Sequence, residues 1–135
     1  MKVFGCIDIH GSKFLYQFAE EKFNAETYLM FLENVLAKKY YPRKVCYIQD
    51  NASYHKDKDI WAWFKENKEW LFVKNLPPYC PELNATEYIW HHTRMQGTHN
   101  QYFDTKEKIQ EKLESVFSGI QKNPKEINGY IRPFL

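Results

Sequence analysis

Apolar residues along the first part of the chain follow a strand-like spacing and then a helical one. Lys2–Ile9 and Lys13–Phe18 are rich in β-branched and aromatic side chains, and the turn-forming segment His10-Gly11-Ser12 separates them, which predicts a β-hairpin. From Asn24 to Lys39 the spacing becomes helical, and Asn24 is a suitable N-cap. The apolar face of this predicted helix comprises Tyr28, Phe31, Leu32, Val35 and Leu36.

The middle of the chain has the pattern of a strand, a helix and a second strand. Lys44–Gln49 is an almost continuous apolar run, which is typical of a strand buried on both faces, and we expect it to be a central parallel strand. Asp57–Asn67 has a helical pattern and Trp70–Leu76 a strand pattern. Together these three segments predict a crossover unit between parallel strands.

Prolines mark the loop that follows, because Pro77-Pro78-Tyr79-Cys80-Pro81 can sustain neither a helix nor a strand ladder. Beyond it, Ala85–Gln96 and Thr105–Gln121 have helical patterns, whereas Asn123–Leu135 contains two prolines and is less regular. We find no internal repeat or linker, so residues 1–135 are expected to form one α/β domain with a mixed sheet. The apolar face of the last long helix comprises Ile109, Leu113, Val116, Phe117 and Ile120.

Composition excludes a disordered chain and a membrane-spanning one. Hydrophobic residues make up 44% and aromatic residues 18% of the 135 positions, so the chain can build one core. A net charge of +2 neither requires nor excludes a nucleic-acid partner. Cys6, Cys46 and Cys80 are widely spaced, which argues against a disulfide framework or a zinc site and indicates a reducing compartment. Since no apolar run is long enough to cross a bilayer, we expect a soluble cytoplasmic protein.

The first candidate for chemistry is Asp50, which directly follows the predicted parallel strand. Loops at the carboxyl ends of such strands often carry functional groups. Two interpretations are open, because Asp50 with Asn51 could equally form a turn or cap the next helix. The residues that follow are polar and suited to contacts with phosphate, with Ser53, His55, Lys56 and Lys58 among them.

The second candidate is Glu87, near the start of the predicted helix after the proline-rich loop. Taken alone, its spacing from Asn84 is that of a capping box, in which the glutamate serves only the helix terminus. Taken with Asp50, it could converge on hard cations such as Mg²⁺, which prefer oxygen ligands. Two such ions about 4 Å apart can activate an attacking oxygen and stabilise a leaving one in phosphodiester chemistry.

Two long segments carry a family resemblance. Tyr47–Lys56 (YIQDNASYHK) and Leu76–Trp90 (LPPYCPELNATEYIW) resemble the DDE domain of mariner-superfamily insertion-sequence transposases. Asp50 and Glu87 lie 37 positions apart (87 − 50), close to the family's usual separation of its second and third acidic residues. Cys80 and Ala85 depart from the serine and proline most usual in the loop, at positions that should not bind metal. The resemblance extends over nearly the whole chain.

The resemblance implies a ribonuclease H-like α/β fold, in which a mixed β-sheet is flanked by α-helices. It also implies cleavage and strand transfer of DNA at transposon ends, with Mg²⁺ or Mn²⁺ as cofactor and two ions in the complete site. Asp50 is similar to the second catalytic carboxylate and Glu87 to the third, and both would bind metal. An insertion sequence indicates a bacterial or archaeal source.

The family's first catalytic aspartate has no clear counterpart. In the family it ends a central strand that precedes the hairpin, and this chain is expected to lack that strand. By the resemblance, Asp8 falls within the next strand. Asp8 could therefore be a metal ligand that completes the site or simply a hairpin residue near the turn. Three accounts stay open: an upstream segment joined by frameshifting, a strand supplied by a second polypeptide, or an inactive remnant. The open sheet edge would invite pairing with another chain, either a second copy or an upstream-encoded transposase segment.

Several basic residues are candidate contacts to the DNA backbone, namely Lys56, Lys58, Lys74 and Arg94. His91 and Arg94 share the helical face of Glu87. The alternative to a DNA contact for Arg94 is a side chain that is simply exposed to solvent. His92 is expected to lie on a solvent-exposed face of the helix. The residues Trp61, Trp63, Phe64, Trp70 and Trp90 are expected to pack rather than to stack on bases.

The leading function is therefore a transposase catalytic domain. One rival is an inactive DNA-binding or assembly module derived from a transposase, which would bind DNA or a partner without cleavage. Another is a ribonuclease H-type or repair nuclease that acts on duplexes lacking transposon ends. Activity of the chain alone, the end sequence, the target site and the oligomeric state do not follow from the sequence.

Overall fold

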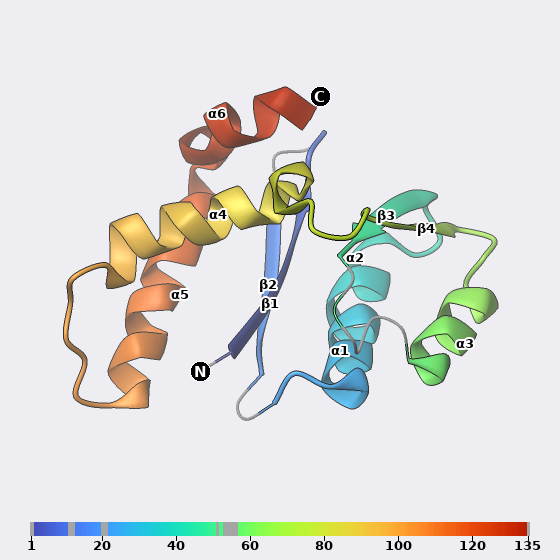
Figure 1. The fold of residues 1–135 in the computed structure, drawn as a ribbon, viewed down its shortest axis with the longest axis horizontal. Helices are drawn as coiled ribbons and strands as arrows, with labels where there is room; N and C mark the ends of the chain where they lie inside the picture. The colour runs from blue at the N-terminus through green and yellow to red at the C-terminus, as the bar shows by residue number, and fades with distance from the viewer. Residues whose placement is uncertain (1, 11–12, 20–21, 51, 53–56, 135) are drawn as a thin grey trace. The chain divides into compact units, whose positions relative to one another are not determined.

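The strands form two separate two-stranded sheets in the computed structural model, which describes residues 2–10, 13–19, 22–50, 52 and 57–134 (Figure 1). β1 (Lys2–Asp8) pairs with β2 (Lys13–Ala19), and the connection through residues 9–12 is short enough only for antiparallel pairing. β3 (Val45–Gln49) pairs in parallel with β4 (Leu71–Asn75). The predicted mixed α/β class is confirmed and is consistent with a ribonuclease H-like fold.

The chain divides into two units, which are described separately. The first unit contains Gly5–Tyr16 and Ala85–Leu135, and the second contains Lys2–Phe4 and Gln17–Asn84. The hairpin contributes residues to both. Within the described residues, no helix combines the length and the apolar character needed to cross a membrane.

One continuous helical segment opens the second unit, as the sequence predicts. It comprises α1 (Ala25–Phe31), the wider π-helical turns of η1 (Leu32–Ala37) and α2 (Lys38–Tyr40). The Asn24 side chain accepts a hydrogen bond from Thr27 N at 2.9 Å, and Thr27 Oγ1 accepts one from Asn24 N at 3.0 Å. This reciprocal cap satisfies two backbone donors that have no partner inside the helix. The predicted apolar face is buried at Tyr28, Phe31, Leu32 and Leu36.

The crossover from β3 to β4 is made by α3 (Lys58–Glu66), in agreement with the sequence pattern. The Asp57 side chain caps it by accepting a hydrogen bond from Asp59 N at 2.8 Å. Ile60 and Phe64 form the buried face of the helix. Figure 1 shows α1 and α3 on the same side of the β3–β4 pair.

The expectation that β3 is buried on both faces is wrong. Tyr47 and Gln49 are buried, whereas Cys46 and Ile48 on the opposite face are exposed. The physical reason is that α1 and α3 cover the same face: Tyr47 meets the hydroxyl of Tyr28 and the ring of Phe64. The expected central position is also not found, because β4 is the only strand paired with β3 in the described part of the chain.

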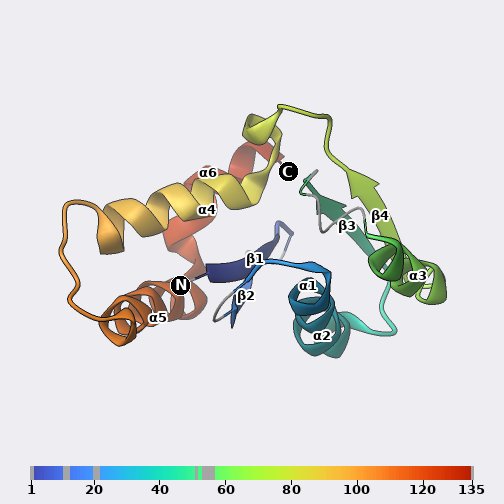
Figure 2. The ribbon, with the colours of Figure 1, turned by 60° about the horizontal axis from the view of Figure 1, so that its bottom comes forward.

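The first unit is built around helices. α4 (Ala85–Thr93) continues into the π-helical turns of η4 (Arg94–Thr98), and α5 (Lys106–Lys122) follows, so both predicted helices are confirmed. The less regular C-terminal stretch contains η5 (Pro124–Ile127), α6 (Asn128–Ile131) and η6 (Arg132–Phe134). α4 lies beside α5 and α6 (Figures 1 and 2).

An aromatic cluster joins the hairpin residues of the first unit to its helices. The ring of Phe14 lies 5.8 Å from that of Trp90 and 5.3 Å from that of Phe117, measured between centroids. Packing roles are likewise confirmed for Phe64 and Trp70, which are buried. Trp61 is 39% exposed, and its ring lies 5.1 Å from that of Phe64 in an edge-to-face arrangement.

Glycine at position 5 is required by this cluster, and we expect Gly5→Ala to destabilise the protein by about 1–3 kcal/mol. A Cβ atom there would lie 2.5 Å from Trp90 Cη2, so the indole or the strand would have to move. Urea unfolding followed by circular dichroism measures the change.

Gly129→Ala is the matched control. A Cβ atom at position 129 meets nothing within 4 Å, and the residue lies in α6. This variant should be neutral or up to about 1 kcal/mol more stable than the parent, because alanine favours helix. Equal unfolding midpoints for the two variants would contradict the packing described for Gly5.

Candidate active site

Asp50 directly follows β3, at the carboxyl end of the parallel pair. Its Oδ1 atom accepts a hydrogen bond from Ala52 N at 3.0 Å, which closes the turn expected from the sequence. The side chain is half-buried. The hydrogen bond to Ala52 N fixes the orientation of the carboxylate relative to the end of β3.

A buried chain of hydrogen bonds holds the strand end that precedes Asp50. The Tyr28 hydroxyl donates to Gln49 Oε1 at 2.7 Å and lies 2.8 Å from the Tyr47 hydroxyl. Gln49 Nε2 in turn donates to Asn75 Oδ1 at 2.9 Å. These bonds link α1 to the ends of both parallel strands and so restrict the position of the backbone from which Asp50 projects.

Sequence reasoning did not single out Tyr28, Gln49 or Asn75 as contributors to the site. A signal was present, because Gln49 is a polar residue at the end of an otherwise apolar strand and is only 4% exposed. Buried amides are hydrogen-bonded as a rule, so such a residue indicates a polar partner in the core. Which partners it finds depends on tertiary packing.

Glu87 is the third residue of α4 and lies in its first turn, half-buried. A carboxylate there is favoured by the positive end of the helix dipole, whether or not it also binds a cation. Asp50 belongs to the second unit and Glu87 to the first. Their convergence on one site stays a prediction from the sequence.

The helical face that starts at Glu87 continues through His91 and Arg94, both exposed. Arg94 is the first residue of η4, where the helix widens into π-helical turns. The expectation of a solvated His92 is wrong: this side chain is 9% exposed, and its ring lies 5.5 Å from that of Tyr130. His92 faces the interior because α6 packs against that side of α4.

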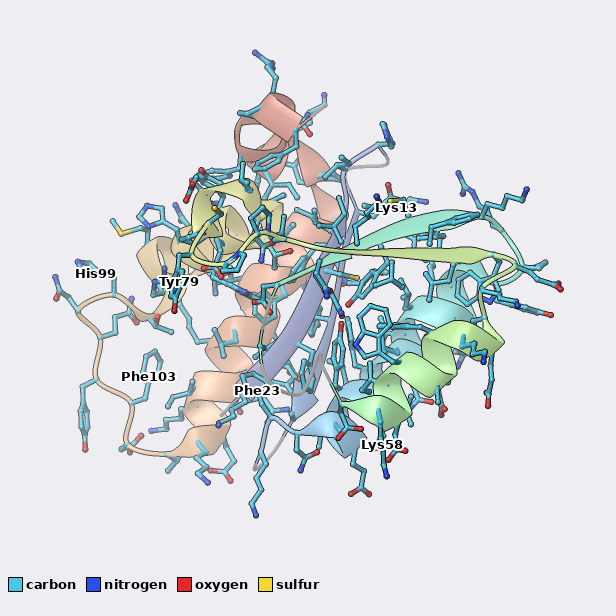
Figure 3. All side chains as sticks on the ribbon, turned by 45° about the vertical axis from the view of Figure 1, so that its right-hand side comes forward. Lys13, Phe23, Lys58, Tyr79, His99 and Phe103 are labelled. Carbon is cyan, nitrogen blue, oxygen red and sulfur yellow. The ribbon has the colours of Figure 1, made fainter. Side chains whose placement is uncertain are left out.

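The other predicted DNA contacts are distributed over the second unit. Lys58 is the exposed first residue of α3 (Figure 3), where an ammonium group can extend into solvent. Lys74 is exposed on β4 and is the register partner of Ile48. Lys56 lies outside the described residues, as do Ser53, Tyr54 and His55.

Asp8 is the last residue of β1, on the same strand as Cys6. Burial, together with the negative charge of Asp8, raises the pKa of the Cys6 thiol from 9.0 to about 12. The thiol is therefore protonated at neutral pH, which makes it a poor nucleophile and a poor metal ligand. Asp8 as a substitute for the family's first catalytic aspartate stays a prediction from the sequence.

No group of three or more His, Cys, Asp or Glu side chains suited to a metal ion occurs among the residues that the structure describes. The donor chemistry of the two candidates nevertheless fits a hard divalent cation, because Asp50 and Glu87 supply carboxylate oxygens. Mg²⁺ keeps several water ligands and needs only one or two carboxylates from the protein.

Comparison with known proteins identifies the family. A family model described as DDE superfamily endonuclease matches residues 1–110, which include both Asp50 and Glu87. The match ends within α5. No curated protein matches the chain.

Removing the Tyr28 hydroxyl tests the hydrogen-bonded chain. We expect Tyr28→Phe to lower the free energy of unfolding by about 1–2 kcal/mol, because its hydrogen bonds to Gln49 and Tyr47 are lost while the ring stays buried. Tyr102→Phe, at a position 90% exposed, should change it by less than about 0.5 kcal/mol. Urea unfolding measures both, and equal effects would argue against the network.

Proposed function

The chain belongs to the DDE superfamily endonucleases, and from this premise we propose that it is the catalytic domain of a DNA transposase. The proposed reaction is divalent-metal-dependent cleavage and strand transfer of DNA at transposon ends, with residues 1–135 as one partial catalytic domain. The observation that most supports it is the position of Asp50 at the carboxyl end of β3, with the strand end held by buried hydrogen bonds.

In this proposal Asp50 and Glu87 are the metal ligands. Nucleases of this family generally use divalent metals, and bound Mg²⁺ or Mn²⁺ would lower the pKa of an attacking hydroxyl and neutralise charge on phosphorus. Asp50 would offer its carboxylate from the end of β3, where its Oδ1 accepts a hydrogen bond from Ala52 N. Glu87 offers its carboxylate from the first turn of α4. Asp50 and Glu87 correspond to the second and third carboxylates of the family, and the first would come from a further strand.

The DNA backbone is the proposed ligand of Lys56, Lys58 and Arg94. Exposure of Lys58 and Arg94 supports this, since a phosphate contact needs an accessible cation. Such contacts contribute affinity that falls with salt and do not read base sequence. Because the proposed substrate is DNA, we propose that the protein acts in the cytoplasm, in association with the nucleoid.

Charge-removing variants of the two carboxylates test the proposal. Asp50→Asn and Glu87→Gln should each lower the affinity for Mn²⁺ more than about tenfold, because a ligand is lost. In the complete enzyme each should also abolish metal-dependent cleavage of a transposon-end duplex. DNA affinity without metal should stay within about twofold, since neither residue is a cation that pairs with phosphate. Calorimetry, gel cleavage assays and fluorescence anisotropy give the three readouts.

Asp59→Asn and Glu107→Gln are matched controls, because each removes one exposed carboxylate from the first turn of a helix. They should bind Mn²⁺ as the parent does. Retained cleavage by both Asp50→Asn and Glu87→Gln would refute the site. Cleavage of any duplex, with no preference for transposon ends, would instead identify a general nuclease.

A second candidate function, an assembly module derived from a transposase, is supported by the open edge of β3. Val45 N donates to Trp70 O and Gln49 O accepts from Leu76 N, so alternate residues 45, 47 and 49 face β4. The backbone groups of Cys46 and Ile48 consequently face the opposite edge, where no strand is paired within the described ranges. Such an edge is a template for a strand of a second copy or of another transposase segment.

Ile48→Pro tests the role of the backbone at this edge, because it removes the outward-facing N–H of residue 48 without removing a hydrogen bond to β4. If edges pair between copies, the parent should associate at micromolar concentration and Ile48→Pro should sediment as a monomer. Ile48→Thr, which keeps the N–H, should still associate. A parent that is monomeric at all concentrations, or a proline variant that associates as the parent does, would contradict self-pairing.

A further inference from the structure

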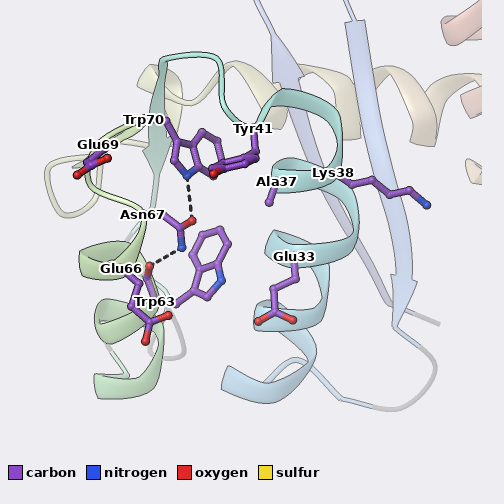
Figure 4. A pocket seen from close by; sticks show the side chains of 9 residues that line it. All are labelled: Glu33, Ala37, Lys38, Tyr41, Trp63, Glu66, Asn67, Glu69 and Trp70. Atoms are coloured by element: carbon purple, nitrogen blue, oxygen red, sulfur yellow. Dashed lines mark hydrogen bonds between the residues drawn. The ribbon is translucent and has the colours of Figure 1, made fainter.

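A cleft of about 550 Å³ lies within the second unit, and its lining includes neither Asp50 nor Glu87 (Figure 4). One side is formed by the continuous helix of η1 and α2, and the other by the C-terminal end of α3 and the residues leading into β4. The cleft is lined by Glu33, Ala37, Lys38, Tyr41, Trp63, Glu66, Asn67, Glu69 and Trp70.

Aromatic rings form part of the walls of this cleft, and a side-chain hydrogen bond holds one of them. The ring of Trp70 packs edge-on against Trp63 at 6.5 Å and against Tyr41 at 5.6 Å between centroids. Asn67 fixes the arrangement: its Oδ1 accepts from Trp70 Nε1 at 2.9 Å, and its Nδ2 donates to the Trp63 carbonyl at 2.8 Å. Trp70 is buried, so the half-buried Trp63 indole and the exposed Tyr41 ring are the aromatic surfaces open to a ligand.

The charge on the rim is negative. Figure 4 shows the carboxylates of Glu33 and Glu66 flanking the Trp63 indole, while the Lys38 side chain points away from it. Within the described residues neither carboxylate has an ion-pair partner. The carbonyl end of α3 adds the negative end of a helix dipole, which Lys65 in its last turn partly offsets.

These features favour an organic cation. The phosphates of DNA would be repelled by the two carboxylates. Among the described residues no group of three or more His, Cys, Asp or Glu side chains is suited to a metal ion. A guanidinium group can contact both the aromatic wall and the acidic rim. Its plane stacks on an indole while its N–H groups donate hydrogen bonds to carboxylates. In a partly desolvated cleft, a cation that contacts both an aromatic face and a carboxylate is bound more favourably than one that makes only one of these contacts.

We propose that this cleft binds an arginine side chain presented by a partner protein. The ligand is recognised by stacking on Trp63 and by ion pairs with Glu33 and Glu66. This site is independent of the catalytic proposal, and it gives the protein a protein-binding surface of opposite charge to the surfaces proposed for DNA.

The four tryptophans of the chain provide a test with internal references. The full chain labelled with 5-fluorotryptophan is titrated with the peptide acetyl-Gly-Ser-Arg-Ser-Gly-amide and followed by ¹⁹F NMR, with the Trp63 resonance assigned through Trp63→Phe. The Trp63 resonance should shift and saturate with a dissociation constant on the order of 1 mM, while that of Trp90, outside the cleft, should not move. The same peptide with citrulline in place of arginine should cause no shift, because it is isosteric but uncharged.

The double variant Glu33→Gln/Glu66→Gln should weaken binding about tenfold, because both ion pairs are lost. Glu107→Gln/Glu111→Gln is the matched control, since it removes the same charge from exposed positions of α5. The proposal would be overturned if the Trp63 resonance did not move at a peptide concentration about tenfold above the expected dissociation constant. It would also be overturned if the citrulline peptide caused an equal shift, or if Glu33→Gln/Glu66→Gln bound the arginine peptide as tightly as the parent. A Trp63 shift on addition of a DNA duplex instead of the peptide would identify a nucleic-acid surface and would also overturn it.

Discussion

The parallel pairing of β3 and β4 is the constraint on which the second unit depends. Two parallel strands need a crossover, and α3 supplies it between Gln49 and Leu71. The crossover helix and α1 then share one face of the pair, so the core gathers there. Tyr28 connects these elements, because its ring packs in the core and its hydroxyl reaches the side chains of Tyr47 and Gln49. The acidic residue proposed for catalysis follows this anchored strand end.

The same arrangement leaves the opposite face and edge of β3 open within the described residues. Cys46, Ile48 and Phe72 are exposed there, and Ile48 and Phe72 are 56% and 53% accessible. An exposed apolar face beside an unpaired edge is unusual for a stable monomer, because both are sites of association. Both proposed functions, the catalytic domain and the assembly module, therefore involve β3. A strand added to this edge would lie beside the strand that leads to Asp50.

The second unit carries candidate phosphate contacts and an acidic aromatic cleft at different places. Lys58 and Lys74 are exposed on α3 and β4, whereas Glu33 and Glu66 flank an aromatic cleft at the other end of α3. The helix α3 thus begins with Lys58, a candidate phosphate contact, and ends with Glu66, a carboxylate of the proposed arginine site. Contacts to DNA and to a protein could form at the same time without competing for one surface.

The sequence by itself determined the secondary structure, the α/β class, the family and the two acidic candidates, because these depend on local spacing, capping and contiguous motifs. The capped helix from Asn24, the crossover through α3 and the helix behind Glu87 follow from such patterns. Only the tertiary structure decided that β3 is covered on one face, that His92 is buried against Tyr130, and that Gln49 bonds to Tyr28 and Asn75. An apolar run is compatible with one covered face or two, and a polar residue in a strand does not name its partner. These outcomes depend on which elements pack together, and that information is distributed over residues far apart in the chain.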